Sequence, residues 1–595
     1  MEAKRVELSF ATAAPKPEEL WSRTTEKSIR VPIGRSGAVR LQELELGKGT
    51  AQHALIAGRT GSGKSTLFHV LITNTGLWFS PRDVEFYLID FKKGVEFKAY
   101  ATHLMPHARV IAIESDREFG LSVLKRLDRE LDRRGELFRR AGVQDLANYL
   151  KGKPPEHLPR TLLVVDEFQE FFTEDDGVAQ EAALLLDRFV RQGRAFGLHI
   201  ILGSQTLSGV YTLAKSTLGQ MGVRIALQCN EADSYLILSE DNAAARLLSR
   251  PGEAIYNDMS GLVEGNVPFQ IVWLSGEQEA EYLRQIAAKS HAAGARPGRS
   301  TVVFEGNAPA LLEHNALLSA CLEEKGPAEK AALAVWLGEP NAIKDPTEAR
   351  FTDAGGSHLL MIGQRKDAVL GMTCSIVLSL AARLGPEQLR VLLLDGSGSE
   401  EEFTQHLRRL AEAVPHEVAI VSNRDLPEAI GALDAQIAAG QEDRHGPARH
   451  TFLFVLGLHR FKALRQEDDF ALTTNRDEGP SAGERFANIL REGPEHHIHT
   501  VVWCDTLANT NRALNRRTLH EFDQRVLFQM SAADSSELID SPAANKLGLH
   551  SALLFVESDG ILEKFRPYAL PEERWLQSVG ATLHARTSQK APSGD

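Results

Sequence analysis

The chain has 595 residues and a formal net charge of −13 at pH 7; 43% of its residues are hydrophobic and 25% are charged. These values are typical of globular domains with an ample core. No apolar run approaches the roughly 20 residues that a membrane-spanning helix needs, and no N-terminal secretory signal is visible. The four cysteines (Cys229, Cys321, Cys374 and Cys504) show no metal-binding spacing. We therefore expect a soluble, cytoplasmic protein with reduced thiols.

A phosphate-binding loop follows a mixed, polar lead segment at residues 1–30. The apolar run His53–Gly58 predicts a strand, and Thr66–Ile72 has helical spacing. A strand, a glycine-rich loop and a helix in this order are typical of nucleotide-binding P-loops. The candidate nucleotide-binding residues are Gly58, Arg59, Thr60, Gly61, Ser62, Gly63, Lys64, Ser65 and Thr66.

The chemistry of this loop predicts binding of ATP with Mg²⁺. Its glycines let backbone amides turn toward a polyphosphate at the helix N-terminus, where the helix dipole also favours negative charge. Lys64 is predicted to bridge the β- and γ-phosphates, and the Ser65 hydroxyl to ligate Mg²⁺.

A second acidic motif lies about 100 residues further on. Thr161–Glu167 has four apolar residues before Asp166 and Glu167, which predicts a buried parallel strand that delivers carboxylates at its C-terminal end. We expect Asp166 to hold the metal and Glu167 to act as the base that orients the attacking water. An alternative for such a run is the capped start of a helix.

Two more strands are expected in the same sheet, Val84–Asp90 and Leu198–Gly203. Gln205 follows the second of them and could sense the γ-phosphate; the alternative is an ordinary loop amide. Before that strand lies a basic helix end, Arg188–Arg194. Arg194, or Arg191 in its place, could neutralise transition-state charge in a neighbouring subunit, although basic residues at a helix C-terminus also complement the dipole.

Five motifs in order resemble the FtsK/SpoIIIE motor domain of the RecA-like HerA-FtsK ATPases. They are GRTGSGKS, LIDFKKG, LLVVDEF, GRAFGLHIILGSQT and the strand-like Gly252–Tyr256. The similarity extends from about Val31 to Ser275. It implies a ring-forming motor, usually a hexamer, that pulls double-stranded DNA; a secretion branch of the family moves proteins instead.

One motif, which bears on the substrate, differs from that of the family members that translocate DNA. The Asp90–Gly94 segment differs from their Asp-Pro-Lys form and is closer to the Asp-Phe-Lys-Gly-Gly form of the type VII secretion ATPase EccC. The family's roles, carried over by position, fall on Lys64, Ser65, Asp166, Glu167 and Gln205, and with less support on Arg194.

The second half of the chain repeats the first at an offset near 300 residues. The collinear pairs include His53–Gly58 with His358–Gly363, and Leu198–Leu207 with Ile498–Leu507. The copy has lost its chemistry. Ala368, Val369 and Leu370 replace Gly63, Lys64 and Ser65; Leu456 and Gly457 replace Asp166 and Glu167; Asp505 replaces Gln205; and Pro494 replaces Arg194.

We therefore predict an α/β fold with two tandem RecA-like P-loop domains, the first active and the second degenerate. The apolar Val369 and Leu370 would leave a triphosphate unpaired, so the second domain should not hydrolyse ATP. The expected divisions are a lead segment 1–30, the active domain 31–275, a linker 276–330, the degenerate domain 331–570 and a tail 571–595.

Charge separates the two halves. Through Ser275 there are 34 basic and 35 acidic residues, against 33 and 45 in the remainder. Because phosphate contacts need local positive charge, the first domain is the better DNA surface, through Lys92, Lys93 and the helix Lys125–Arg140. The acidic second domain is better suited to a ring contact, to regulation or to docking a protein.

The leading hypothesis is a ring-forming ATPase that translocates double-stranded DNA. The alternatives are a type VII secretion-like protein translocase, and the motor subunit of a defence or conjugation assembly.

Overall fold

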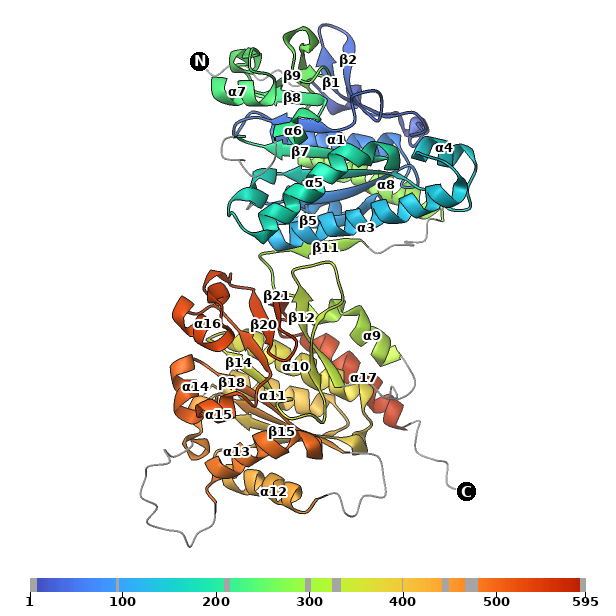
Figure 1. Ribbon diagram of the computed structural model, residues 1–595. Coiled ribbons are helices and arrows are strands. Elements are labelled where there is room, and N and C mark those ends of the chain that lie inside the picture. The colour runs from blue at the N-terminus through green and yellow to red at the C-terminus, as the bar shows by residue number, and fades with distance from the viewer. Residues whose placement is uncertain are drawn as a thin grey trace, which may run out of the picture. The chain divides into compact units, whose positions relative to one another are not determined.

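The computed structural model describes residues 8–92, 96–207, 215–294, 301–323, 333–398, 400–440, 449–465 and 480–588. The chain divides into two compact units, Met1–Gly306 and Asn307–Asp595. Each unit is a mixed β-sheet with helices against it (Figure 1). Within the described ranges, no helix is both long enough and apolar enough to cross a membrane.

In the described part of the first unit, eleven strands form one sheet in the order β11-β5-β4-β6-β7-β3-β8-β9-β10-β1-β2. The run from β11 to β8 is parallel and the run from β8 to β2 is antiparallel. The strands are β1 (Ile29–Ser36), β2 (Arg40–Leu46), β3 (Ala54–Ala57), β4 (Val84–Asp90), β5 (Ala108–Ile113), β6 (Arg160–Asp166), β7 (Leu198–Ser204), β8 (Val223–Leu227), β9 (Glu253–Asn257), β10 (Val267–Ile271) and β11 (Val302–Glu305).

Helices cover both faces of this sheet. Figure 1 shows α3 and α5 side by side across one face, while α1 and α8 share a core with the other face, in which strand residues such as Ile56 and Val164 take part. The helices are α1 (Lys64–Trp78), α2 (Lys98–Thr102), α3 (Arg117–Ala141), α4 (Leu146–Lys151), α5 (Gly177–Phe196), α6 (Lys215–Gly219), α7 (Glu231–Ile237) and α8 (Gly276–Ala292).

Two segments that we expected outside the first domain belong to its sheet and core. In the lead segment, Phe10 is fully buried in the core of this unit. Of the expected linker 276–330, helix α8 buries Leu283 and Ile286 in the same core, and β11 pairs in parallel with β5. The expected end of the first domain at residue 275 is therefore too early; residues 295–300 lie outside the described ranges.

In the described part of the second unit, ten strands form a sheet in the order β13-β12-β21-β20-β19-β14-β18-β17-β15-β16. The strands are β12 (Leu333–Pro340), β13 (Thr347–Phe351), β14 (Leu359–Ile362), β15 (Leu389–Asp395), β16 (Glu417–Val421), β17 (His450–Leu456), β18 (Ile498–Cys504), β19 (Gln524–Leu527), β20 (Ala552–Val556) and β21 (Ile561–Pro567). The helices are α9 (Ala316–Glu323), α10 (Lys366–Arg383), α11 (Glu401–Ala413), α12 (Leu426–Ala438), α13 (Ala482–Glu492), α14 (Leu507–Ala513), α15 (Arg516–Leu519), α16 (Ala532–Ile539) and α17 (Glu573–Ser588).

The two sheets have the same strand order and the same parallel and antiparallel halves, from β5 to β2 in one and from β16 to β13 in the other. Strand β11 is the addition in the first unit. The predicted tandem repeat and fold class are thus confirmed.

Individual hydrogen bonds repeat as well. His53 meets the Val190 carbonyl through Nε2 at 3.1 Å, and its copy His358 meets the Leu490 carbonyl at 2.7 Å. Each imidazole Nδ1 also accepts a backbone N–H from the neighbouring strand. Burial lowers the pKa of both histidines to about 4, so both rings are neutral at neutral pH.

The predicted tail 571–595 contains helix α17, which is part of the second core through Leu576, Val579 and Leu583. An amphipathic helix of this kind is stabilised by its packing. The end of the expected tail, residues 589–595, lies outside the described residues.

Candidate active site in the first unit

The P-loop joins β3 to α1 as expected. Gly61 (φ 80°) and Gly63 (φ 105°) take the left-handed backbone that glycine adopts without strain. A Cβ on Gly58 would lie 2.6 Å from Ser62 Oγ and 2.7 Å from Leu227 Cβ, so no larger residue fits there. Within a cleft of about 270 Å³, the predicted loop residues that form part of the lining are Arg59, Thr60, Gly61, Gly63, Lys64, Ser65 and Thr66.

Lys64 is the first residue of α1 and lies buried between the two predicted acids. Its ammonium donates to Oδ1 of Asp166 and, at 2.8 Å, to Oε1 of Glu167. Burial raises the pKa of Asp166, against the opposing effect of the Lys64 charge. The parallel pairing of β6 within the sheet therefore brings three predicted residues together from positions 100 residues apart.

Glu167 stands at a sharp turn directly after β6. Its backbone is left-handed, with φ 54°, which is uncommon for a residue with a side chain. Its carboxylate accepts Gln205 Nε2 at 2.7 Å and Gln169 Nε2 at 2.6 Å. Burial alone would raise the pKa of Glu167, but the Lys64 charge and these hydrogen bonds lower it, so the side chain is an anion at neutral pH.

Gln205 links this carboxylate to the loop. Besides donating to Glu167, it accepts the Thr60 hydroxyl at 2.8 Å through Oε1. A contact that joins the phosphate loop to the predicted base is what a γ-phosphate sensor requires.

Ser65 donates to Oε1 of Glu96 at 2.9 Å, and Glu96 also binds His69, which in turn binds the buried Glu279 of α8 at 2.8 Å. Burial would lower the pKa of His69, but Glu279 and Glu96 raise it to about 9, so the imidazole is a cation. No local sequence motif predicts this network, because its members come from distant segments.

The donor set around Ser65 suits a hard divalent cation. Asp90, beside Asp166 in the sheet, is fully buried, and its Oδ2 has no hydrogen-bond partner within the described ranges. Burial raises the pKa of Asp90 to about 7, and the charges of Asp166 and Glu96 add to this effect. Carboxylate and hydroxyl oxygens are the ligands that Mg²⁺ prefers. The predicted metal residues Ser65 and Asp166 thus fit, and Asp90 and Glu96 add to them.

Arg194 lies elsewhere. It is exposed in the last turn of α5, just before β7 starts, whereas the P-loop and Glu167 follow the ends of their strands. In a parallel crossover these are opposite edges of the sheet. The neighbouring candidate Arg191 pairs with Asp187 at 2.8 Å.

The matching loop in the second unit is shorter. Six residues separate β3 from α1, but only the three residues 363–365 separate β14 from α10. Helix α10 therefore starts one turn earlier and occupies the path of a phosphate loop. Val369, the counterpart of Lys64, is fully buried, and Lys366 pairs with Glu400.

Known proteins are similar to parts of this chain. Residues 17–209 match the FtsK/SpoIIIE family model. The ESX secretion system protein EccC of Geobacillus thermodenitrificans is 34% identical over 238 residues, which are 39% of this chain and 15% of that protein. EccC5 of Mycobacterium tuberculosis is 30% identical over 276 residues, 43% of this chain and 19% of that protein. The matched part is thus a small fraction of these relatives.

Solved structures match nearly the whole chain. The cytoplasmic domain of the Thermomonospora curvata type VII secretion ATPase EccC superposes with a TM-score of 0.65 at 20% identity, covering 99% of this chain and 71% of that one. ATPases 2 and 3 of the same EccC, in complex with a signal sequence peptide, give 0.55 at 17% identity and cover 95% and 98%. ATPases 2 and 3 of Geobacillus thermodenitrificans EssC give 0.53 at 15%, covering 96% and 100%. At these identities the likeness establishes the tandem fold.

Proposed function

We propose that this chain, whose first unit carries a P-loop ATPase domain of the FtsK/SpoIIIE family, is an ATP-driven motor of a type VII secretion-like protein translocase. Two observations together carry the proposal. The first unit brings Lys64 of the P-loop into contact with Glu167, and the relatives that it matches are named as secretion system proteins. They favour the alternative from the sequence over our leading hypothesis of DNA translocation.

In the proposed reaction, the first unit hydrolyses ATP. The loop amides and Lys64 would bind the phosphates. Ser65 and Asp166, with Asp90 and Glu96 beside them, would hold Mg²⁺, which neutralises charge between the β- and γ-phosphates. Glu167 would orient the attacking water and accept its proton, since its lowered pKa keeps it ionised.

The proposed Glu167 base is positioned by its hydrogen bonds. Gln205 and Gln169 fix its carboxylate, and the Ser204 hydroxyl in turn donates to Gln169 Oε1 at 2.8 Å. When Lys64 turns to the phosphates, these amides would keep the carboxylate in place. Gln205 would report the γ-phosphate to the loop through Thr60.

Hydrolysis would need several copies of the chain assembled in a ring. From the family resemblance we propose that this ring is a hexamer. Because Arg194 lies at the sheet edge away from its own P-loop, it could act only in a neighbouring subunit. A subunit interface of this kind would place Arg194 of one copy in the nucleotide-binding cleft of the next copy.

The second unit would bind protein instead of ATP. Its short loop and buried Val369 do not suit a triphosphate, and the sequence after Ser275 has 33 basic against 45 acidic residues, which disfavours a DNA backbone. A related solved structure of two tandem ATPases holds a signal sequence peptide. We propose that a signal segment of a secreted protein binds this unit. The name of the relative as a cytoplasmic domain supports a cytoplasmic location.

The hypothesis that the chain translocates double-stranded DNA has less support. The helix that we expected to grip phosphates, α3, uses Lys125, Arg133 and Arg139 in ion pairs with neighbouring glutamates. Such paired charges give a backbone-binding surface little net attraction. The other expected contact, Lys93, lies outside the described residues.

One experiment separates the two substrates. The full chain carrying Glu167→Gln, with ATP, is exposed to a displayed library of random peptides and, in parallel, to linear duplex DNA at low salt. We expect peptide enrichment and no retarded DNA band. ATP turnover of the wild-type chain that rises with duplex DNA and not with the enriched peptide would overturn the secretion proposal.

A further inference from the structure

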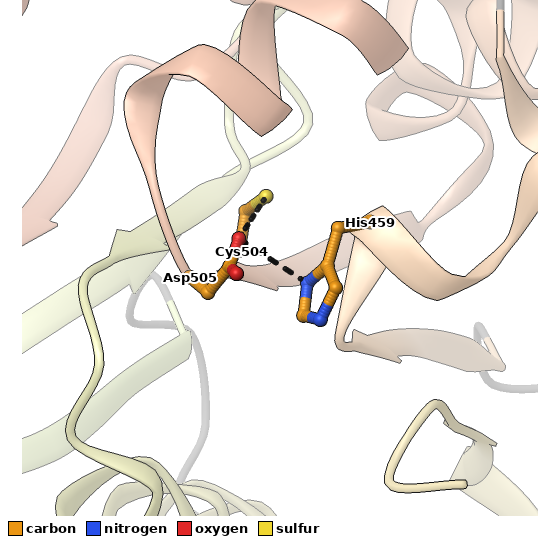
Figure 2. A group of neighbouring side chains, drawn as sticks. All are labelled: His459, Cys504 and Asp505. Atoms are coloured by element: carbon orange, nitrogen blue, oxygen red, sulfur yellow. Dashed lines mark hydrogen bonds and ion pairs between the residues drawn. The ribbon is translucent and has the colours of Figure 1, made fainter.

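Three metal-ligating side chains meet at one edge of the second sheet. His459 comes from the short 3₁₀ turn η8 (Leu458–Arg460) that follows β17, and Cys504 and Asp505 come from the end of β18. Their ligand atoms all lie within 4.8 Å of one another. Figure 2 shows the carboxylate of Asp505 between the imidazole of His459 and the sulfur of Cys504.

Two of the three spacings between these atoms are close to those of a tetrahedral metal site. His459 Nδ1 lies 3.4 Å from Asp505 Oδ1, and Cys504 Sγ lies 3.8 Å from the same oxygen. Bonds of about 2.0 Å to nitrogen and oxygen and about 2.3 Å to sulfur, at tetrahedral angles, put nitrogen and oxygen about 3.3 Å apart and sulfur and oxygen about 3.5 Å apart. Small side-chain shifts would therefore complete the geometry.

The two units differ at all three of these positions. β17 and β18 pair in the same register as β6 and β7: Phe454 faces Val501 where Val164 faces Ile201. The residue after β17, Gly457, is left-handed like Glu167. By this register, the counterparts of His459, Cys504 and Asp505 are Gln169, Ser204 and Gln205.

In the first unit these counterparts are neutral hydrogen-bonding groups around the proposed base. Ser204 donates to Gln169 at 2.8 Å, and Gln205 donates to Glu167 at 2.7 Å. The second unit has no glutamate at this place and carries an imidazole, a thiol and a carboxylate there. Chance drift of a degenerate site has no reason to produce three ligand types at one point.

The surroundings hold the three side chains in place. Asn509 Nδ2 donates to Asp505 Oδ1 at 2.8 Å, and the ring of Trp503 stands edge-on to His459, with centroids 6.2 Å apart and planes at 87°. His459 Nδ1 is buried and makes no hydrogen bond within the described ranges. Supporting contacts of this kind orient ligands at protein metal sites.

One side of the cluster is open. Cys504 is fully buried, but the side chains of His459 and Asp505 are 18% and 28% exposed and line a cleft of about 280 Å³. Three protein ligands with one open position are typical of zinc sites that take a water or an outside group as the fourth ligand.

We propose that His459, Cys504 and Asp505 form a binding site for one divalent transition-metal ion of the zinc class. A thiolate and an imidazole select such ions over Mg²⁺ and Ca²⁺. The ion would join the ends of β17 and β18 where the first unit places its catalytic carboxylate. The site is independent of the proposed secretion function and of ATP hydrolysis.

The test uses Co²⁺ as the probe, added to the full chain after chelator treatment. We expect one equivalent to produce thiolate-to-cobalt charge-transfer absorption that Zn²⁺ abolishes. Cys504→Ser should remove this absorption. Cys374→Ser, a matched control at another buried thiol of the same unit, should leave it unchanged.

His459→Gln and Asp505→Asn should each weaken Co²⁺ binding at least about tenfold. Because His459 is partly exposed, we expect His459→Gln to fold. If Cys504→Ser does not fold, the Co²⁺ affinity of His459→Gln tests the site instead. A second measurement is the thermal midpoint, which Zn²⁺ should raise in the wild type and not in His459→Gln. Absorption that survives Cys504→Ser, or Co²⁺ affinity unchanged in His459→Gln, would overturn the proposal.

Discussion

Lys64 and Glu167 form a buried ion pair, with Nζ 2.8 Å from Oε1 and both side chains less than a tenth exposed. The ammonium that would hold the phosphates therefore also holds the proposed base. A triphosphate in the loop competes with Glu167 for this ammonium. Nucleotide binding and release of the base become one event, since Lys64 cannot make full contact with both.

Lys64→Ala should abolish ATP binding, because the phosphates lose their cation and two buried carboxylates lose their partner. Nucleotide affinity measured with a fluorescent ATP analogue would fall by at least about 100-fold. The matched control is Lys366→Ala in the second unit, which should leave affinity and turnover unchanged. Wild-type turnover in Lys64→Ala would contradict the site.

Glu167→Gln should bind ATP and fail to cleave it. The amide keeps the size of the side chain and one accepting oxygen for Gln205 or Gln169, but it cannot accept a proton, so single-turnover hydrolysis should fall by about 10² or more. Glu170→Gln, on the 3₁₀ turn Phe168–Phe172 beside it, is the control and should hydrolyse ATP at the wild-type rate. Normal cleavage by Glu167→Gln would place the base elsewhere.

Arg194→Ala should lower the turnover number by about 10³ to 10⁵ if this side chain completes a neighbour's site. Arg191→Ala, whose side chain is paired with Asp187, should cost less than about tenfold. Mixing Arg194→Ala with Lys64→Ala subunits should restore part of the activity, because some mixed interfaces contain both groups. If the turnover number of Arg194→Ala falls by less than about tenfold, Arg194 does not neutralise transition-state charge in the neighbouring subunit.

The stability of the chain should fall in mild acid. Burial lowers the pKa of His53, His107, His358 and His450 from 6.5 to about 4. Between these values the unfolded chain binds more protons than the folded one, so the free energy of unfolding decreases as pH falls from about 6.5 to about 4. Each histidine contributes up to about 1.4 kcal/mol per pH unit.

Urea midpoints measured across this range would check the slope. His358→Gln should flatten it, and His520→Gln, at a side chain 60% exposed, should not. Asp90 acts in the opposite direction, because its raised pKa favours the protonated form in the folded state. A midpoint independent of pH would contradict the histidine assignment.

Much of the site could be predicted from the sequence because its motifs are local. The P-loop residues, Glu167 and Gln205 follow the ends of apolar strands, Asp166 is the last residue of one, and parallel strands bring such ends to one edge of a sheet. The repeat could be predicted for the same reason, since strand ends and turns keep their order.

What could not be predicted depends on contacts between distant segments. Glu279 meets His69 because α8 packs on α1, and Glu96 reaches His69 from the segment before α2; no pattern within a single segment predicts these contacts. Strand β11 was not predicted because a run of four residues carries little signal, yet the ring of Phe304 stacks on that of Phe119 with centroids 3.9 Å apart. The boundary of the first domain was therefore expected too early.

The shortened loop of the second unit limits what evolution can recover there. Returning Val369 to lysine would put an ammonium into a fully buried apolar environment, since the helix now begins a turn before it. Residues 366–368, which now form the first turn of α10, would have to unwind into a loop before any substitution could help. A single substitution therefore cannot restore a phosphate loop at this end of the second sheet, whose residues can instead serve other ligands.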